Sequence, residues 1–115
     1  NKERIQRALE SIDGVRVVNE RPEAETSWFG VPTVCEDNNL KRSLVAYLEE
    51  NKIQTRNYFA GNILLHPGYR DLGKASDYPN ANQVLDKVFF LGCSPTINEK
   101  MLTYIEKVIG NYVSN

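Results

Sequence analysis

The sequence predicts an α+β fold in which helices pack on a small, mostly antiparallel sheet. Apolar side chains recur with helical spacing in some segments and with strand-like spacing in others. These segments come in the order helix, strand, strand, helix, strand, loop, helix, strand, helix. The chain has 115 residues, the size of one ordinary domain, with 41% hydrophobic and 25% charged residues, as in globular proteins. We therefore expect residues 1–115 to form a single domain.

The first expected element is an amphipathic helix over residues 2–13. Its apolar side chains share one face at helical spacing: Ile5, Ala8, Leu9 and Ile12. Gly14 is expected to end this helix, because glycine is common just past a helix C-terminus. A short strand over 15–18 and a polar linker over 21–25 are expected to follow.

The next segment, residues 27–35, has the aromatic and β-branched residues of a strand. Gly30 and Pro32 within it predict a strand at the edge of the sheet or one with a bulge, because proline cannot donate to a ladder. Trp28 and Phe29 are interpreted as packing residues, in the core or between domains, rather than as a platform for a ligand.

A second helix is expected to begin at a cap formed by Asn38 or Asn39 and to end at Asn51. Its apolar face would contain Leu40, Leu44, Val45 and Leu48. Residues 53–59 alternate well enough for a third strand.

Residues 60–79 show neither a helical nor a strand period, and long loops of this kind tend to be functional. Three apolar residues, 63–65, lie within this loop and would be costly to leave in water. Either they fold back on their own sheet, or a second domain or subunit covers them; the residues alone favour neither alternative.

The chain is expected to close with a short helix over 80–87, an apolar strand over 88–91 and a last helix. Thr96 with Glu99, or Asn98 alone, would cap this last helix. Its apolar face is predicted to contain Met101, Ile105, Val108, Ile109 and Tyr112.

Charge and composition argue against several classes of function. The 14 Lys and Arg and 15 Asp and Glu give a net charge of −1, whereas nucleic-acid binders need excess positive charge. The apolar runs are far shorter than the roughly 20 residues that span a bilayer. The charged first residues do not resemble a signal peptide, and the absence of an initial Met suggests a processed or trimmed chain.

The cysteines and the single histidine offer little for metal chemistry. Cys35 and Cys93 are interpreted as buried free thiols in a reducing compartment, with one disulfide as the alternative. Together with His66 they are too few for a zinc site, which needs about four ligands, so no metal is assigned. Arg56 could present its guanidinium to a phosphate or carboxylate, although a solvated strand residue is the favoured interpretation.

Four motifs resemble those of one enzyme family. In order they are Ser27-Trp-Phe-Gly-Val-Pro, Thr55-Arg-Asn-Tyr-Phe-Ala-Gly-Asn, Phe89-Phe-Leu-Gly-Cys-Ser-Pro and Asn98-Glu-Lys-Met-Leu-Thr-Tyr. Over residues 24–115 the chain resembles the C-terminal small domain of the pyridoxal-phosphate (PLP) sugar aminotransferase and dehydratase superfamily. Phe59-Ala-Gly-Asn62 is typical of its nucleotide-sugar 3-dehydratases for 3,6-dideoxyhexoses of lipopolysaccharide; the aminotransferases usually have His near position 62.

This resemblance implies a larger enzyme. Members of the superfamily are several times longer, hold the cofactor in a large domain and work as dimers with active sites between subunits. The aminotransferases form a Schiff base with a lysine, whereas the dehydratases have His there and use pyridoxamine phosphate (PMP). We therefore expect a C-terminal fragment that has no catalytic residue or cofactor of its own and is inactive alone. PLP or PMP would be bound in the intact enzyme.

The resemblance also implies roles for the segment that follows the third strand. Arg56 would help to hold a phosphate, and Phe59 would shape the pocket wall. Asn62 would hydrogen-bond substrate or cofactor, or alternatively serve only as a turn residue. A basic residue is frequent near position 65 in the family, where this chain has Leu65. Either His66 or Arg70 would replace it in holding the diphosphate, or the enzyme would handle a different nucleotide.

The preferred hypothesis is the small domain of a nucleotide-sugar 3-dehydratase of lipopolysaccharide deoxysugar biosynthesis. Its partners would be the N-terminal PLP domain, the second subunit of a cytoplasmic homodimer and the nucleotide-sugar substrate. One alternative is the same domain from a sugar aminotransferase. The other is a stand-alone, non-catalytic α+β domain for binding or assembly.

Overall fold

The computed structural model describes residues 1–24, 28–57, 63–65 and 67–114. Its helices are α1 (Lys2–Glu10), α2 (Asn38–Glu50), α3 (Pro79–Lys87) and α4 (Glu99–Ser114), and its strands are β1 (Val15–Val17), β2 (Gly30–Cys35), β3 (Thr55–Asn57) and β4 (Val88–Gly92). Three short 3₁₀ helices, η1 (Ile63–Leu65), η2 (Pro67–Leu72) and η3 (Ala75–Asp77), lie between β3 and α3. The predicted order of helices and strands is confirmed.

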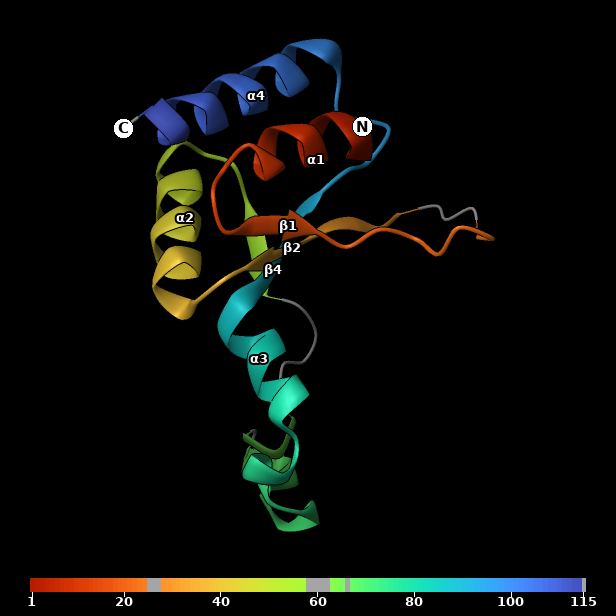
Figure 1. The fold of residues 1–115 in the computed structure, drawn as a ribbon, viewed down its shortest axis with the longest axis vertical. Helices are drawn as coiled ribbons and strands as arrows, with labels where there is room; N and C mark the ends of the chain where they lie inside the picture. The colour runs from red at the N-terminus through yellow and green to blue at the C-terminus, as the bar shows by residue number, and fades with distance from the viewer. Residues whose placement is uncertain (25–27, 58–62, 66, 115) are drawn as a thin grey trace.

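The strands of the described chain form one antiparallel sheet in the order β1-β2-β4-β3. Helices α1 and α4 lie together over one side of this sheet, and α2 stands beside them (Figure 1). The core between helices and sheet contains the apolar residues expected of the first two helices, among them Ile5, Leu9, Leu44 and Leu48, together with Phe89 and Leu91 of β4. The α+β architecture predicted from the sequence is confirmed.

Strand β2 is neither an edge strand nor bulged, because it lies inside the sheet and its register with both neighbours advances one residue at a time, so the prediction from Gly30 and Pro32 is wrong. It lies between β1 and β4, and Pro32 is aligned with Phe90. The sheet tolerates the proline because the Pro32 carbonyl accepts from the Val18 N–H, 3.0 Å away, just beyond the end of β1. The backbone polar groups of Pro32 thus face the end of a short strand, and no ladder bond to β4 is lost.

Two helix ends differ from the sequence prediction. Helix α1 ends at Glu10, and Gly14 forms the turn into β1 with φ of +84°. Helix α2 is capped by Asp37, whose carboxylate accepts from the Leu40 N–H at 2.8 Å, rather than by either asparagine that follows it. An Asp in extended conformation before the first turn serves as well as Asn, so composition alone could not decide between them.

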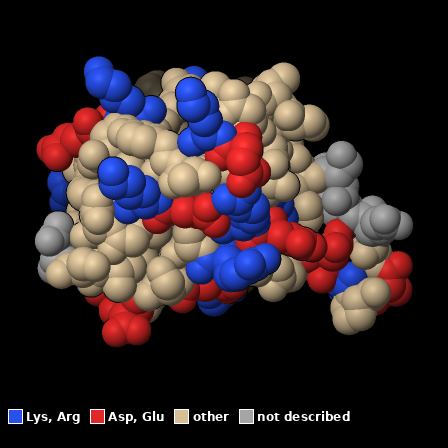
Figure 2. Space-filling view, turned by 90° about the horizontal axis from the view of Figure 1, so that it is seen from above, with Lys and Arg blue, Asp and Glu red and all other residues tan. Residues whose placement is uncertain are grey.

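The predicted apolar face of helix α4 is confirmed except at Met101: Val108 and Ile109 are buried, and Ile105 and Tyr112 pack partly buried against the core. Leu102 is buried, whereas Met101 is 51% exposed. The Asn98 side chain accepts from the Met101 N–H at 2.9 Å, which selects Asn98 from the two predicted caps. Arg4 of α1 forms ion pairs with Glu99 and Glu106 of α4. Basic and acidic side chains are intermixed on the face that carries α4 (Figure 2).

Cys35 and Cys93 are both buried and free, as the favoured interpretation predicted. Burial raises the pKa of the Cys35 thiol to about 11 and also raises that of Cys93. No helix in the described chain is long and apolar enough to cross a membrane.

Candidate functional site

The predicted site residues begin at β3, the strand at one edge of the sheet. Arg56 lies in β3, and its side chain is exposed. Phe59, Asn62 and His66 lie outside the described residues, so their predicted roles stay predictions. The described part of the candidate site therefore comprises β3, the neighbouring face of the sheet, and the 3₁₀ helices that follow.

Strand β3 is held at its start by α2. The Glu49 carboxylate accepts from both the N–H and the hydroxyl group of Thr55, at 2.8 and 2.9 Å. The hydrogen bond from the Thr55 N–H, followed by that from its hydroxyl, lowers the pKa of Glu49. Lys52, with φ of +64°, forms the tight turn that brings the chain from α2 back to the sheet. The hydrogen bonds between Glu49 and Thr55 and the turn at Lys52 thus fix the backbone just before Arg56.

The Arg56 guanidinium is available to an anion. With the Gln54 amide turned so that its oxygen faces Arg56, the guanidinium donates to this oxygen at 2.9 and 3.3 Å. The ion pairs formed between described residues both belong to Arg4, so none engages Arg56. The Arg56 charge also contributes to lowering the pKa of the nearby Glu49, while the guanidinium stays exposed to a phosphate or carboxylate.

An aromatic pair lies on the same face of the sheet as Arg56. Arg56 is aligned with Phe90 of β4, whose ring is tilted against Phe29 at 5.7 Å between centroids. Trp28 packs partly buried against the core, as predicted, but Phe29 is 77% exposed, which contradicts a core role for it. Phe90 could not be identified from the sequence, because an apolar strand does not show which side chains face the core.

The segment after β3 forms a projecting arm, defined here as residues 63–65 and 67–78. It lies at the far end of the molecule from α4 and joins the sheet through α3 (Figure 1). The sequence analysis expected no regular structure here, whereas the chain forms three 3₁₀ helices. Such short helices leave no period long enough to detect in a sequence.

The arm exposes large apolar side chains. Leu65 is 53% and Leu72 is 72% exposed, and Tyr69 and Tyr78 are each about half exposed. Leu65 does not fold back on the sheet, which was one of the two predicted alternatives. Exposed apolar residues gathered on one projection indicate a surface that another body covers.

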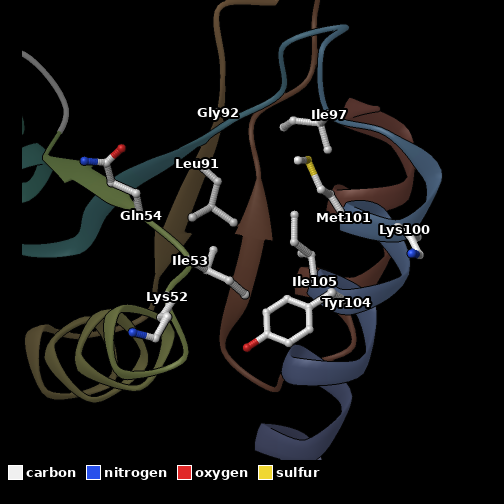
Figure 3. A pocket seen from close by; sticks show the side chains of 10 residues that line it. All are labelled: Lys52, Ile53, Gln54, Leu91, Gly92, Ile97, Lys100, Met101, Tyr104 and Ile105. Carbon is white, nitrogen blue, oxygen red and sulfur yellow. The ribbon is translucent and has the colours of Figure 1, made fainter.

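Two of the open pockets formed by described residues border the sheet on the side of α4 and the side of α3, and neither was predicted. One, of about 510 Å³, lies between the end of β4 and α4, where Ile53, Leu91, Met101 and Ile105 form apolar walls beside Tyr104 (Figure 3). The other, of about 410 Å³, lies between α3 and the sheet face that carries Pro32 and Val34.

The two pockets just described lack one group that PLP enzymes provide. Neither of these two pockets is lined by an acidic side chain that could pair with the pyridine nitrogen. The buried lysine of the described chain, Lys41, donates its ammonium proton to the Leu85 carbonyl oxygen at 2.6 Å. We therefore assign no cofactor chemistry to these residues.

Comparison with known proteins shows which family and which curated proteins the chain is similar to. The model of the DegT/DnrJ/EryC1/StrS aminotransferase family matches residues 1–109. The chain is 31% identical to the dTDP-4-dehydro-2,6-dideoxy-D-glucose 3-dehydratase of Saccharopolyspora spinosa, over 99% of this chain and 26% of that protein. It is 35% identical to the lipopolysaccharide biosynthesis protein RfbH of Salmonella typhimurium, over 75% of this chain and 22% of that protein. The chain thus spans about a quarter of the length of these relatives.

Solved structures share the fold at low identity. The aminotransferase TlmJ from Streptoalloteichus hindustanus superposes with a TM-score of 0.77 at 19% identity, over 98% of this chain and 29% of that chain. DesV of S. venezuelae, solved with a ketimine intermediate, superposes with a TM-score of 0.84 at 15% identity, over 99% of this chain and 30% of that chain. With the family model matching nearly the whole sequence, the chain belongs to the DegT/DnrJ/EryC1/StrS aminotransferase family.

Proposed function

We propose that the chain is the C-terminal small domain of a PLP- or PMP-dependent nucleotide-sugar 3-dehydratase of deoxysugar biosynthesis. The observation that carries this proposal is the similarity to a curated sugar 3-dehydratase along 99% of the chain. RfbH, a lipopolysaccharide biosynthesis protein, supports the same assignment. The cofactor and the general base would belong to the rest of the enzyme, where we expect His in place of the Schiff-base lysine.

The role proposed for this domain is to complete the substrate pocket. The arm would pack against the cofactor-binding part, because its leucines and tyrosines are exposed without such a cover. Arg56, exposed on β3, would hold a phosphate of the nucleotide sugar. For Phe59, Asn62 and His66 we propose the pocket wall, a substrate or cofactor hydrogen bond, and an anion contact, respectively.

The proposed assembly is a homodimer in the cytoplasm. The two buried free thiols suit a reducing compartment, where disulfides are rare. We propose active sites between the subunits, to which each small domain contributes its arm.

A sugar aminotransferase is the second candidate, because the solved proteins that share the fold include aminotransferases. The same small domain would then serve an enzyme with lysine at the Schiff-base position. A stand-alone binding domain is disfavoured by the exposed Leu65 and Leu72, which such a domain would be expected to bury.

The reaction of the longer protein tests the proposal. We would sequence the reading frame upstream of Asn1, purify its product and incubate it with PMP and a nucleotide-4-keto-6-deoxysugar. Loss of the C3 hydroxyl, detected by mass spectrometry, is the expected result. Transfer of an amino group from glutamate to the sugar would establish the aminotransferase instead. A gene product whose N-terminus lies near Asn1 would refute both.

A further inference from the structure

The first turn of α2 contacts the last turn of α3 through two side chains. Lys41 Nζ donates to the Leu85 carbonyl oxygen at 2.6 Å, and Asn38 Nδ2 donates to the Asp86 carbonyl oxygen at 2.7 Å. The last carbonyl groups of a helix have no partner within the helix and carry partial negative charge. An amide and an ammonium group on a neighbouring helix are suitable donors for them.

Lys41 is buried to a degree that is unusual for a lysine, with 7% of the residue exposed. An ammonium group at this depth is costly unless it is hydrogen-bonded and compensated by charge. Burial lowers the pKa of Lys41, while Cys35 and Asp86 act in the opposite direction. The Leu85 carbonyl accepts the hydrogen bond, and the partial negative charge at the C-terminal end of α3 compensates the positive charge of the buried Lys41.

Apolar packing alone does not fix α3 and the arm. None of the residues in η2, η3 or α3 is buried. The arm is tied to α3 through η3, where the Asn82 side chain and the Tyr78 N–H both donate to the Ala75 carbonyl oxygen, at 3.1 Å each. The direction of the arm therefore follows the direction of α3, and α3 is held to α2 by Lys41 and Asn38.

We propose that Lys41 and Asn38 are positioning residues that aim the arm at the substrate pocket of the longer enzyme. They would act through α3, and neither would touch substrate. The role in substrate binding rests on the function proposed above, whereas the effect on the direction of the arm does not.

The direction of the arm can be measured in the 115-residue chain. We would place spin labels on cysteines introduced at Ser76 in η3 and Thr103 in α4, both exposed, since the native thiols are buried. Lys41→Met retains the apolar stem and removes the ammonium group. Lys107→Met, in the exposed part of α4, is the matched control.

We expect Lys41→Met to broaden the distance distribution between the labels, and Asn38→Ala to broaden it less, with no change in Lys107→Met. A residue that merely stabilised the fold would lower the melting temperature without broadening the distribution. If Lys41→Met fails to fold by circular dichroism, Asn38→Ala decides the question. An unchanged distribution in the folded variants would overturn the proposal.

The same substitutions in the longer enzyme separate this inference from the proposed function. We expect Lys41→Met to raise the KM for the nucleotide sugar more than it lowers kcat, with Lys107→Met unchanged. Broadened distances with unaltered kinetics would mean that the two residues hold α3 but the arm has no part in substrate binding. The proposed role of the arm, and with it the positioning role, would then be wrong.

Discussion

At the scale of single residues, Gly30 is the position where the backbone leaves least room. A Cβ atom there would clash with Phe90 Cδ2 and lie 3.1 Å from the Leu91 carbonyl oxygen, whereas one at Gly92, its partner in the register, would meet nothing within 4 Å. Gly30 thus lets the Phe90 ring cross β2 on the face that carries Arg56.

We expect Gly30→Ala to lower the free energy of unfolding by about 1–3 kcal/mol, because the ring must move out of a packed position. Gly92→Ala should change it by no more than about 0.5 kcal/mol. Urea denaturation of both variants measures the difference, and equal stabilities would contradict the close approach of Phe90 to Gly30.

Met101 and Leu102 are neighbours with opposite roles in α4. Leu102 is 5% and Met101 is 51% exposed, although the sequence pattern places Met101 on the apolar face. We expect Leu102→Ala to cost about 2–5 kcal/mol of unfolding free energy, as for other buried leucines. Met101→Ala should cost much less, and denaturant titration would contradict the burial of Leu102 and the exposure of Met101 if the order were reversed.

Helical spacing shows which positions share a face, but it does not decide between two adjacent apolar residues at the border of that face. In α4 both Met101 and Leu102 are apolar, so the pattern could not decide which of them is buried. The position of β2 was missed for a different reason, since the rule that excludes proline from inner strands assumes that both neighbours are long. Here β1 ends at Val17, just before the ladder would require the Pro32 N–H.

At the scale of elements, a glutamate accepts a hydrogen bond from an outward N–H group on each edge strand of the sheet. Glu10 accepts from the Val17 N–H of β1 at 3.2 Å, and Glu49 accepts from the Thr55 N–H of β3. These carboxylates occupy outward N–H groups that another strand could otherwise pair with. Each glutamate comes from the helix that precedes the strand, so both edges are protected by local contacts.

The bond from Glu49 to β3 should make stability depend on pH. The pKa of Glu49 is lowered from 4.5 in the folded chain, so its contribution is present above 4.5 and is lost as the pH falls through the folded value. We expect Glu49→Gln to flatten the loss of stability below pH 4.5. Glu50→Gln, one residue along and exposed, is the control. Identical pH profiles for Glu49→Gln and the unmodified chain, from thermal melts, would refute the role of Glu49.

The order and kind of the helices and strands could be predicted because each has its own apolar period. The candidate site could be predicted only in part. Arg56 was identified within its strand, but the partners Gln54 and Phe90 depend on the sheet register and the backbone turn. The arm was recognised as unusual, yet its 3₁₀ helices and the joint with α2 involve contacts between residues more than 40 positions apart, which a local pattern does not record.

At the scale of the whole molecule, the chain combines a packed body with a projecting arm. The molecule measures 47 × 36 × 23 Å, and its long axis runs from α4 to the arm (Figure 1). The body has its own core, whereas the arm exposes Leu65, Tyr69, Leu72 and Tyr78. This contrast suits a domain that folds as a unit but is completed by the rest of a longer enzyme, about four times its length in the curated relatives.

The central claim is that another part of the enzyme covers the arm. Amide hydrogen exchange of residues 63–65 and 67–78, compared between the 115-residue chain and the longer protein, tests it most directly. We expect rapid exchange in the chain alone and strong protection in the longer protein, with the strands β2 and β4 protected in both. An arm that is well protected in the monomeric chain, or that exchanges equally fast in both proteins, would contradict the claim.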